Sequence, residues 1–429
     1  MNEAGICSGC GVCAGICPAR CIDMVWNACG ELRAVKAGCC RHCGLCRRVC
    51  PFENDMEGDE TLKRKLFPQA PVAFKGYDPA LRECSASGGL ATRFLQGLLS
   101  DGIVDFVICA GRRGSSLGFQ IVADPKMLPS LTGSVYFPME LSETIKTVMR
   151  QEGRYAVIGL PCVIKALRKA AAIIPSLDGK LIVFAGLICG RQMNARFPEY
   201  LAMSAGLGAV PEGDIRYHAH DGVAPASDYS ADITRPDGNI ARIRCSDERY
   251  ETGWAYFGLE ACRYCDDVFA DYADASFMDA WLPEYAGETH GTSLVLLRNP
   301  AYVKCFSGCP TIKPALMDEI IAAQTGSRVL PDKTERVVLR ALFSGKLKNL
   351  PLKNKRISPL RFLLEWLPVS MEAATRRFVA RGFSAVRDGR RSFHRLYGEM
   401  RFLHYLRRLL AAPYAVLYFI RHRGGSRVK

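Results

Sequence analysis

The sequence predicts a chain of the α+β and α/β classes in three parts: a small cysteine-rich module, an α/β domain with a mixed or parallel sheet, and a basic helical C-terminal tail. Three observations predict this division. Two cysteine runs of identical spacing lie near the N-terminus, strand and helix patterns alternate between residues 103 and 188, and the excess of Lys and Arg lies at the C-terminal end. The expected boundaries are 1–52 for the module, 53–71 for a linker, 72–310 for the α/β domain and 311–429 for the helical region.

Both cysteine runs have the spacing C-x2-C-x2-C-x3-C-P; one begins at Cys7 and the other at Cys40. In two-cluster bacterial ferredoxins with this spacing, the first three cysteines of one run and the last cysteine of the other hold one 4Fe–4S cluster. The spacing therefore predicts a two-cluster 4Fe–4S ferredoxin-like module. The expected ligands are Cys7, Cys10, Cys13 and Cys50 for one cluster, and Cys40, Cys43, Cys46 and Cys17 for the other.

Zinc binding and a disulfide framework explain these cysteines less well. Zinc sites usually separate two C-x2-C pairs by a longer loop, whereas each run here places four cysteines within eleven residues. Disulfides require a secreted chain, and nothing at the N-terminus resembles a signal peptide. Because iron–sulfur proteins are made where thiols stay reduced, we expect a cytoplasmic protein. Cys21, Cys29 and Cys39 fall outside the pattern and receive no role.

The net charge of +14 is concentrated in one region. From Lys346 to Lys429 there are 20 Lys and Arg residues against four Asp and Glu residues, a net charge of +16. The rest of the chain therefore has a net charge of −2. Any attraction to a polyanion or an anionic surface belongs to the C-terminal region.

The α/β domain begins with a helix pattern over residues 90–99, which ends at Asp101-Gly102 and is followed by a strand pattern at 103–109. Ser87-Gly88-Gly89 precedes this helix. A serine and two glycines at a helix start let the backbone approach a phosphate or a ring closely. An ordinary helix start is the alternative, and these residues alone favour it.

Strand patterns at 155–158 and 181–188 flank a helix pattern at 163–171, which predicts a parallel sheet covered by helices. In such sheets, ligands bind beyond the carboxyl ends of the strands. Cys162 and Cys189 both follow a strand at this position. For each of them taken singly, a buried structural cysteine is the better interpretation.

A C-x2-C pair, Cys262 and Cys265, follows a segment of short strands and loops at 205–250. Such a pair alone is ambiguous among zinc, redox and cluster roles. Together with Cys162 and Cys189, it supplies the four thiols that a further 4Fe–4S cluster needs. Spare candidates are Cys305 and Cys309.

No catalytic residue is identified from the sequence, because no Ser-His-Asp or Cys-His arrangement is visible. His218 and His220 alternate as they would in a strand, and we interpret them as solvated or structural.

The C-terminal region ends in a helix pattern over residues 395–420. Twelve uncharged residues between Arg408 and Arg421 are too few to span a bilayer and are typical of an interfacial helix. We therefore expect an anionic membrane surface as a partner; solvated helices packed on the domain are the alternative. No nucleic-acid motif accompanies the basic residues. One helix face contains Leu396, Met400, Leu403, Leu406 and Leu410.

These motifs resemble the coenzyme F-420 hydrogenase/dehydrogenase beta-subunit family from the cysteine-rich module to about residue 300. The marks are Ser87-Gly88-Gly89, Gly159-Leu160-Pro161-Cys162, Cys189-Gly190, the Cys262/Cys265 pair with Asp266-Asp267, and Gly291-Thr292-Ser293. The resemblance implies FAD and a third 4Fe–4S cluster. It places the cluster on Cys162, Cys189, Cys262 and Cys265, and the flavin near Ser87, Gly88, Gly89, Ser134, Tyr136, Asp279 and Thr292.

A flavin is also expected on chemical grounds, because clusters exchange single electrons whereas organic substrates and deazaflavins exchange hydride. The sequence thus predicts an iron–sulfur flavoprotein oxidoreductase that exchanges electrons with ferredoxin or another redox protein. Its substrate would be a small organic molecule or a deazaflavin coenzyme. The alternatives are an electron-transfer subunit of a larger redox complex without its own substrate site, and a membrane-surface assembly protein.

Overall fold

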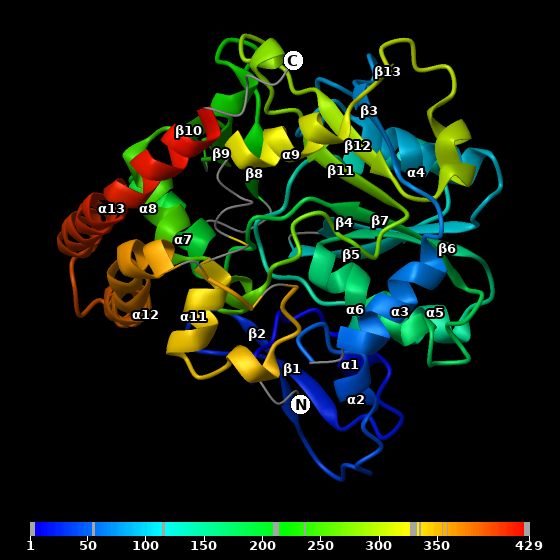
Figure 1. Ribbon diagram of the computed structural model, residues 1–429, viewed down its shortest axis with the longest axis horizontal. Coiled ribbons are helices and arrows are strands. Elements are labelled where there is room, and N and C mark those ends of the chain that lie inside the picture. The colour runs from blue at the N-terminus through cyan, green and yellow to red at the C-terminus, as the bar shows by residue number, and fades with distance from the viewer. Residues whose placement is uncertain are drawn as a thin grey trace.

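The computed structural model is organised around one central β-sheet (Figure 1). Figure 1 shows the N-terminal module, in blue, below this sheet and two long C-terminal helices, α12 and α13, side by side at its left. The structure describes residues 5–53, 56–113, 116–208, 214–235, 237–326, 333, 336–353, 355–357 and 359–423.

The central sheet has eight strands and is mixed, as expected for the α/β domain. In spatial order the strands are β13 (Lys313–Pro314), β3 (Val72–Gly76), β12 (Ser293–Leu297), β11 (Ala275–Asp279), β7 (Leu181–Leu187), β6 (Tyr155–Gly159), β4 (Phe106–Arg113) and β5 (Ser116–Val122). Strands β11, β7, β6 and β4 are parallel, and the outer strands are antiparallel to their neighbours. Because β13 pairs with β3, the sheet continues beyond residue 310, where we expected the α/β domain to end.

Helices cover both faces of the sheet. On one face, α4 (Leu90–Ser100) packs beside η6 (Pro300–Phe306). On the other face lie α5 (Ser142–Arg150) and α6 (Pro161–Ala171). The helix predicted at 90–99 is confirmed, but β4 begins at Phe106 instead of residue 103. The reason is that the amides of Ile103 and Val104 donate to Leu98 O and complete the end of α4.

The two cysteine runs have nearly the same backbone. Helix α1 (Val12–Gly15) lies in the first run and α2 (Leu45–Arg48) in the second, and each follows a left-handed glycine, with φ 76° at Gly11 and 75° at Gly44. A side chain would strain this conformation, so both runs need glycine there. An antiparallel hairpin of β1 (Ile22–Trp26) and β2 (Leu32–Lys36) connects the runs.

The segment predicted as a linker contains helix α3 (Met56–Leu66), which packs on the α/β domain. Asp59 of α3 is buried between two lysines of α6; it forms an ion pair with Lys165 and another with Lys169, at 3.1 Å. Asp59, one of the charged residues that resembled a solvated linker in the sequence, therefore attaches α3 to the α/β domain.

Residues 205–250 contain short strands, as predicted. Strands β8 (Ile215–Ala219), β9 (Ser230–Thr234) and β10 (Ile240–Arg244) form a separate antiparallel sheet in the order β10-β9-β8. This small sheet packs with α7 (Arg196–Ser204) and α8 (Glu248–Tyr256) in one apolar cluster, to which the C-terminal helices also contribute.

The C-terminal helices are α9 (Met317–Gly326), α11 (Val337–Phe343), α12 (Pro359–Arg387) and α13 (Phe393–Arg423). The apolar face of α13 packs inward, since Leu396 and Met400 are fully buried. On the same helix, Arg401 pairs with Glu248 at 2.6 Å and Arg408 with Glu251 at 2.8 Å. The part of the predicted membrane face at Leu396 and Met400 therefore contacts protein.

None of the described helices is both long enough and apolar enough to cross a membrane. Within α13, the side chains from residue 414 onward lie outside the described part of the chain, and they include most of the twelve uncharged residues.

Candidate functional site

The thiols predicted for the first cluster lie together in the module. Burial raises the pKa of Cys10, and the neighbouring thiols of Cys13, Cys7 and Cys50 raise it further. The pKa of Cys13 rises to about 12, again through burial and then through Cys7, Cys50 and Cys46. The structure thus brings the four predicted ligands together and places Cys46 of the other set beside them.

The second predicted set is brought together in part. Cys17, Cys40 and Cys46 contribute to one small apolar cluster, whereas Cys43 is exposed. Cys21, which has no role in the spacing pattern, lies among them: its sulfur is 3.6 Å from that of Cys17. Burial, Cys17 and Cys40 all raise the pKa of Cys21. The spacing pattern offered no reason to expect a fifth thiol here.

The third predicted set lines one cavity at the carboxyl ends of two parallel strands. Cys162 lies in the first turn of α6, directly after β6, and Cys189 follows β7. Cys262 lies in the short helix η4 (Ala261–Tyr264) and Cys265 immediately follows it. Cys10 of the N-terminal module lines the same cavity. Cys162, Cys189 and the Cys262/Cys265 pair, which are distant from one another in sequence, thus line the same cavity.

A lysine accompanies these thiols. Lys333 is 1% exposed, and its ammonium group donates to Cys262 O at 3.1 Å. Burial raises the pKa of Cys189 well above its usual value, as do neighbouring thiols, while Lys333 opposes the rise. The backbone amide of Gln192 donates to Cys262 Sγ at 3.2 Å. A single lysine in a basic C-terminal sequence carries no signal, so the sequence could not identify Lys333.

The spare cysteines do not join this set. Cys305 is buried against α4, and Cys309 donates to Tyr77 O at 3.2 Å. Within the described residues, no three His, Cys, Asp or Glu side chains are placed to hold a single metal ion.

Five of the residues predicted to contact a flavin gather where β11 ends and β12 begins. Ser87 Oγ donates to Thr292 O at 3.0 Å, and the side chain of Ser87 also lies close to the carboxyl group of Asp279. Ser134 and Tyr136 are hydrogen-bonded to each other, and burial and then the neighbouring Asp279 raise the pKa of Tyr136. These polar groups therefore form one site beside the small sheet.

The other two predicted residues, Gly88 and Gly89, are required by the packing of the chain itself. A Cβ atom at Gly88 would lie 2.6 Å from Gly76 O and 2.7 Å from Ser293 N. Gly89 has φ +79°, and a Cβ atom there would lie 2.7 Å from that of Leu81. The structure therefore explains both glycines without a ligand, although they are adjacent to Ser87.

His218, which the sequence did not place near the predicted flavin residues, lies beside Asp279. It has a left-handed φ of 52° at a bulge in β8, a conformation that is unusual for a residue other than glycine. Its ring stacks on Tyr229 at 3.8 Å between centroids, and its Nε2 lies 3.9 Å from Asp279 Oδ1. This nitrogen is buried and has no hydrogen-bond partner among the described residues.

Of the two roles expected for these histidines, solvated or structural, the solvated one is therefore wrong for His218, and the structural one stays a prediction. His220 is half-buried, with its Nε2 at 3.0 Å from Ala86 O. The alternation in sequence was correct for a strand, but the bulge turns His218 toward the site. The positive φ that marks this position is visible only in the structure.

Burial shifts the pKa values of Asp279 and His218 in opposite directions. It raises the pKa of Asp279 to about 7 and lowers that of His218 to about 3. At neutral pH the imidazole is therefore uncharged and the carboxyl group lies near its midpoint. Together they offer an unpaired nitrogen and an exchangeable proton to any polar group bound between them.

The three thiol sets and the polar site around Asp279 adjoin one another in the order second set, first set, third set, polar site. Cys46 of the second set contributes to the environment of Cys13 in the first, and Cys10 of the first contributes to that of Cys162 in the third. Cys189 of the third set in turn affects Tyr136 beside Asp279. The thiol sets and the polar site thus form one continuous series through the molecule.

Two family models of the Coenzyme F420 hydrogenase/dehydrogenase beta subunit match this chain: the model of its N-terminal part over residues 73–146, and the model of its C-terminal part over residues 152–311. Together they cover more than half of the chain. A solved chain of the F420-reducing [NiFe] hydrogenase complex from Methanosarcina barkeri is 16% identical, with a TM-score of 0.49 over 67% of this chain and 96% of that chain. No curated protein matches this chain.

Proposed function

This chain belongs to the coenzyme F420 hydrogenase/dehydrogenase beta-subunit family, and from that premise we propose that it is an iron–sulfur flavoprotein oxidoreductase. Family membership implies a redox function. The observation that supports iron–sulfur clusters and a flavin in particular is the continuous series of three thiol sets and one polar site. Electron carriers that exchange electrons with one another must lie close together, and this arrangement would place them so.

The donor chemistry of the thiol sets fits three 4Fe–4S clusters, because cysteine thiolates are their usual ligands. Cys7, Cys10, Cys13 and Cys50 would hold one cluster, and Cys17, Cys40, Cys43 and Cys46 the second. Cys162, Cys189, Cys262 and Cys265 would hold the third. In that third set, the ammonium of Lys333 would offset part of the negative charge of the thiolates. Burying several anionic ligands without such a partner would be unfavourable.

The polar site fits FAD through its unsatisfied groups. The buried Nε2 of His218 has no hydrogen-bond partner among the described residues, and the near-neutral carboxyl group of Asp279 can donate as well as accept. A bound flavin would supply the conversion between one-electron and two-electron chemistry. Ser87 and Thr292 would orient it, while Tyr229 and Tyr136 would limit water at its edge.

We propose a small organic molecule or a deazaflavin coenzyme as the substrate, ferredoxin or another redox protein as the electron partner, and the cytoplasm as the location. An electron-transfer subunit without its own substrate site is the second candidate. Turnover of a small molecule by the purified chain with an artificial reductant would support the first candidate. Electron exchange with a redox protein, but with no small molecule, would support the second.

Cofactor content is the decisive measurement. The full chain, purified anaerobically, is expected to contain about twelve irons and one FAD, since each cubane carries four irons. Iron quantitation and flavin extraction measure both. A preparation reconstituted anaerobically that holds iron but no flavin would contradict the proposal for the polar site. Flavin without iron would contradict the proposal for the thiols.

An anionic membrane surface remains our proposed partner for the C-terminal tail, but through different residues. Phe402, Tyr405 and Leu409 of α13 are each more than 60% exposed, on the side away from Leu396. Sedimentation with anionic vesicles should therefore weaken when Phe402 and Leu409 are both changed to Ser. Unchanged sedimentation of this variant would leave packing on the domain as the role of α13.

A further inference from the structure

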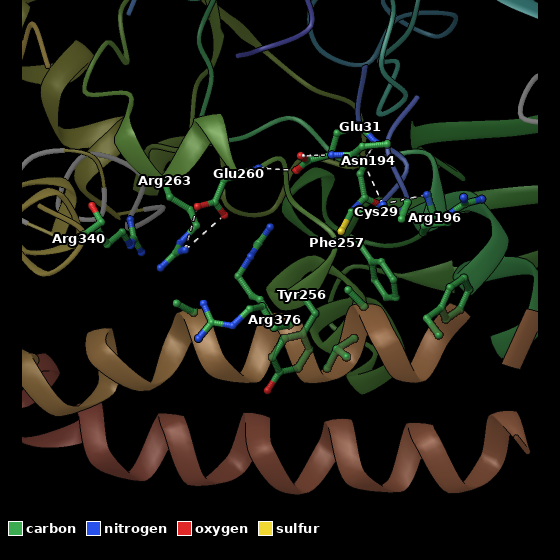
Figure 2. Close-up of a pocket in the computed structure, with 18 of the residues that line it drawn as sticks. Cys29, Glu31, Asn194, Arg196, Tyr256, Phe257, Glu260, Arg263, Arg340 and Arg376 are labelled. Carbon is green, nitrogen blue, oxygen red and sulfur yellow. Dashed lines mark hydrogen bonds and ion pairs between the residues drawn. The ribbon is translucent and has the colours of Figure 1, made fainter. Parts of the chain in front are cut away.

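A second, larger cavity lies away from the polar site, between three parts of the chain. Its volume is about 670 Å³, which lies within the ~300–1,000 Å³ range of small-molecule sites. One wall is the hairpin of the N-terminal module, including Cys29 and Glu31. A second is formed around Asn194 and Phe257, and the third by α11 and α12 (Figure 2). The family models match only the second wall, so this cavity is not a feature of the family domain alone.

Positively charged side chains dominate the lining. Six arginines from all three walls face two glutamates; the arginines are Arg33, Arg196, Arg263, Arg340, Arg376 and Arg377. Both glutamates are engaged in internal contacts: Glu31 accepts from Arg33 at 2.7 Å and from the amide of Glu260 at 2.7 Å, and Glu260 pairs with Arg263 at 3.3 Å. Arg196 and Arg340 are paired as well, with Glu199 at 2.7 Å and Glu372 at 2.9 Å. Among the described residues, the excess positive charge of the cavity therefore belongs to Arg376 and Arg377, which form no ion pair there.

Several of these cations are held in unfavourable surroundings. Arg263 is 8% exposed, and its Nε is buried without a hydrogen-bond partner among the described residues, 3.6 Å from Glu372. Burial lowers the pKa of Arg376; Glu372 and Glu260 oppose this fall, while the nearby Arg263 and Arg191 add to it. Arg376 donates to Gly258 O, which uses one of its five N–H groups. Figure 2 shows Arg376, Arg263 and Glu260 around the same cavity.

An apolar end completes the cavity. Tyr256, Phe257, Val379 and Phe383 line it, and the rings of Phe257 and Phe383 pack edge to face with centroids 5.1 Å apart. A ligand with a hydrophobic body could bury that part here while its acidic groups meet the arginines. Guanidinium groups bind carboxylates and phosphates through paired hydrogen bonds, so Arg376 and Arg377 suit such a group.

We propose that this cavity binds an organic acid that has an apolar or aromatic body and a carboxylate or phosphate group, with Arg263, Arg376 and Arg377 as its main contacts. The binding site adjoins the polypeptide that carries Cys262, because Arg263 follows that cysteine and lines the cavity. The site would therefore give the N-terminal module and the C-terminal helices a shared ligand. Arg376 and Arg377 of the basic C-terminal region would then bind this ligand, in addition to any binding of that region to an anionic membrane surface.

The test is calorimetric titration of the full chain, purified anaerobically, with isophthalate, phenyl phosphate and the neutral benzyl alcohol at constant ionic strength. We expect at least one of the two acids to bind with a Kd below about 1 mM, and benzyl alcohol to bind at least tenfold more weakly. Preference for isophthalate would identify a carboxylate ligand, and preference for phenyl phosphate a phosphate ligand. Both results support the site.

Three variants locate the binding. Arg376→Gln is expected to weaken acid binding at least tenfold, and so is Arg377→Gln, whose side chain is exposed and so is not needed for folding. Arg381→Gln, on the same helix but outside the lining, is the matched control and should bind like the wild type. Iron content and melting temperature check that each variant is intact.

Three outcomes would overturn the proposal. The first is that neither acid binds the wild type with a Kd below about 1 mM. The second is that benzyl alcohol binds as tightly as the acids. The third is that both Arg376→Gln and Arg377→Gln bind like Arg381→Gln. Because none of these measurements uses turnover, they are independent of the proposed redox function.

Discussion

The N-terminal module and the α/β domain both present sets of cysteines, but they assemble them in opposite ways. In the module, Cys7, Cys10 and Cys13 lie on one short turn whose shape is set by the left-handed Gly11. In the domain, Cys162 and Cys189 come together because β6 and β7 are parallel neighbours. The first arrangement is encoded by local spacing and the second by the topology of the whole sheet.

This difference predicts different consequences of mutation. We expect a local set to tolerate the loss of an exposed thiol such as Cys43 without damage elsewhere, because the turn is held by its own backbone. A set assembled by topology shares its surroundings with the core, since Cys162 begins a helix whose other side is buried against β6 and β7. Comparing equivalent substitutions in the two regions therefore tests the proposed clusters and their dependence on the fold.

The largest effect is expected in the module. Cys43→Ser should remove one cluster, about four of about twelve irons, because it deletes one of four ligands. The control is Cys39→Ser, since Cys39 is equally exposed and lies four residues earlier, outside the pattern. Iron quantitation and the reduced-state electron resonance spectrum distinguish the two variants. Equal iron in both would show that Cys43 is not a ligand.

An equivalent loss of about four irons is expected for Cys265→Ser in the α/β domain. Here Cys309→Ser is the matched control, because Cys309 is a half-buried thiol in the same domain that donates to Tyr77 O instead of lining the cavity. The resonance signals of the two module clusters should persist in Cys265→Ser. If their signals disappear while a third persists, the division into local and topological sets is wrong.

A smaller effect concerns the pH dependence of stability. Folding raises the pKa of Asp279 from 3.8 to about 7, so the folded chain binds more protons than the unfolded chain between these values. The contribution of Asp279 to stability is therefore full below about pH 4 and is lost as the pH rises to about 7. In flavin-free wild type the melting temperature should therefore fall over this pH range, and Asp279→Asn should remove the fall. A parallel pH profile in wild type and variant would contradict a buried, protonated Asp279.

The smallest predicted effect is on the potential of the proposed third cluster. Lys333→Met should make this potential more negative by on the order of 60 mV, about tenfold in the one-electron equilibrium constant, because a buried positive charge is lost beside the thiols. The module clusters should keep their potentials. Lys304→Met is the control, since Lys304 lies outside the cavity. Redox titration followed by electron resonance measures each potential separately.

The sequence predicted the elements that follow from local pattern. The helix at 90–99, the alternation that places β6 and β7 in parallel, and the strand ends at Cys162 and Cys189 were all readable from periodicity. The sequence could not identify residues whose partners lie far away in the chain. Lys333 and His218 carry no local signal, and the charged segment containing Asp59 resembled a linker because its lysine partners lie more than a hundred residues away.

Cys10 makes the module and the domain mutually dependent during assembly. Its carbonyl oxygen accepts from the amide of Leu141 at 3.0 Å, and its side chain lines the cavity of the third set. The docked module therefore closes this cavity on one side. We therefore expect iron loading of the proposed third set to be faster before the module docks than afterwards, because the docked module restricts access from this side.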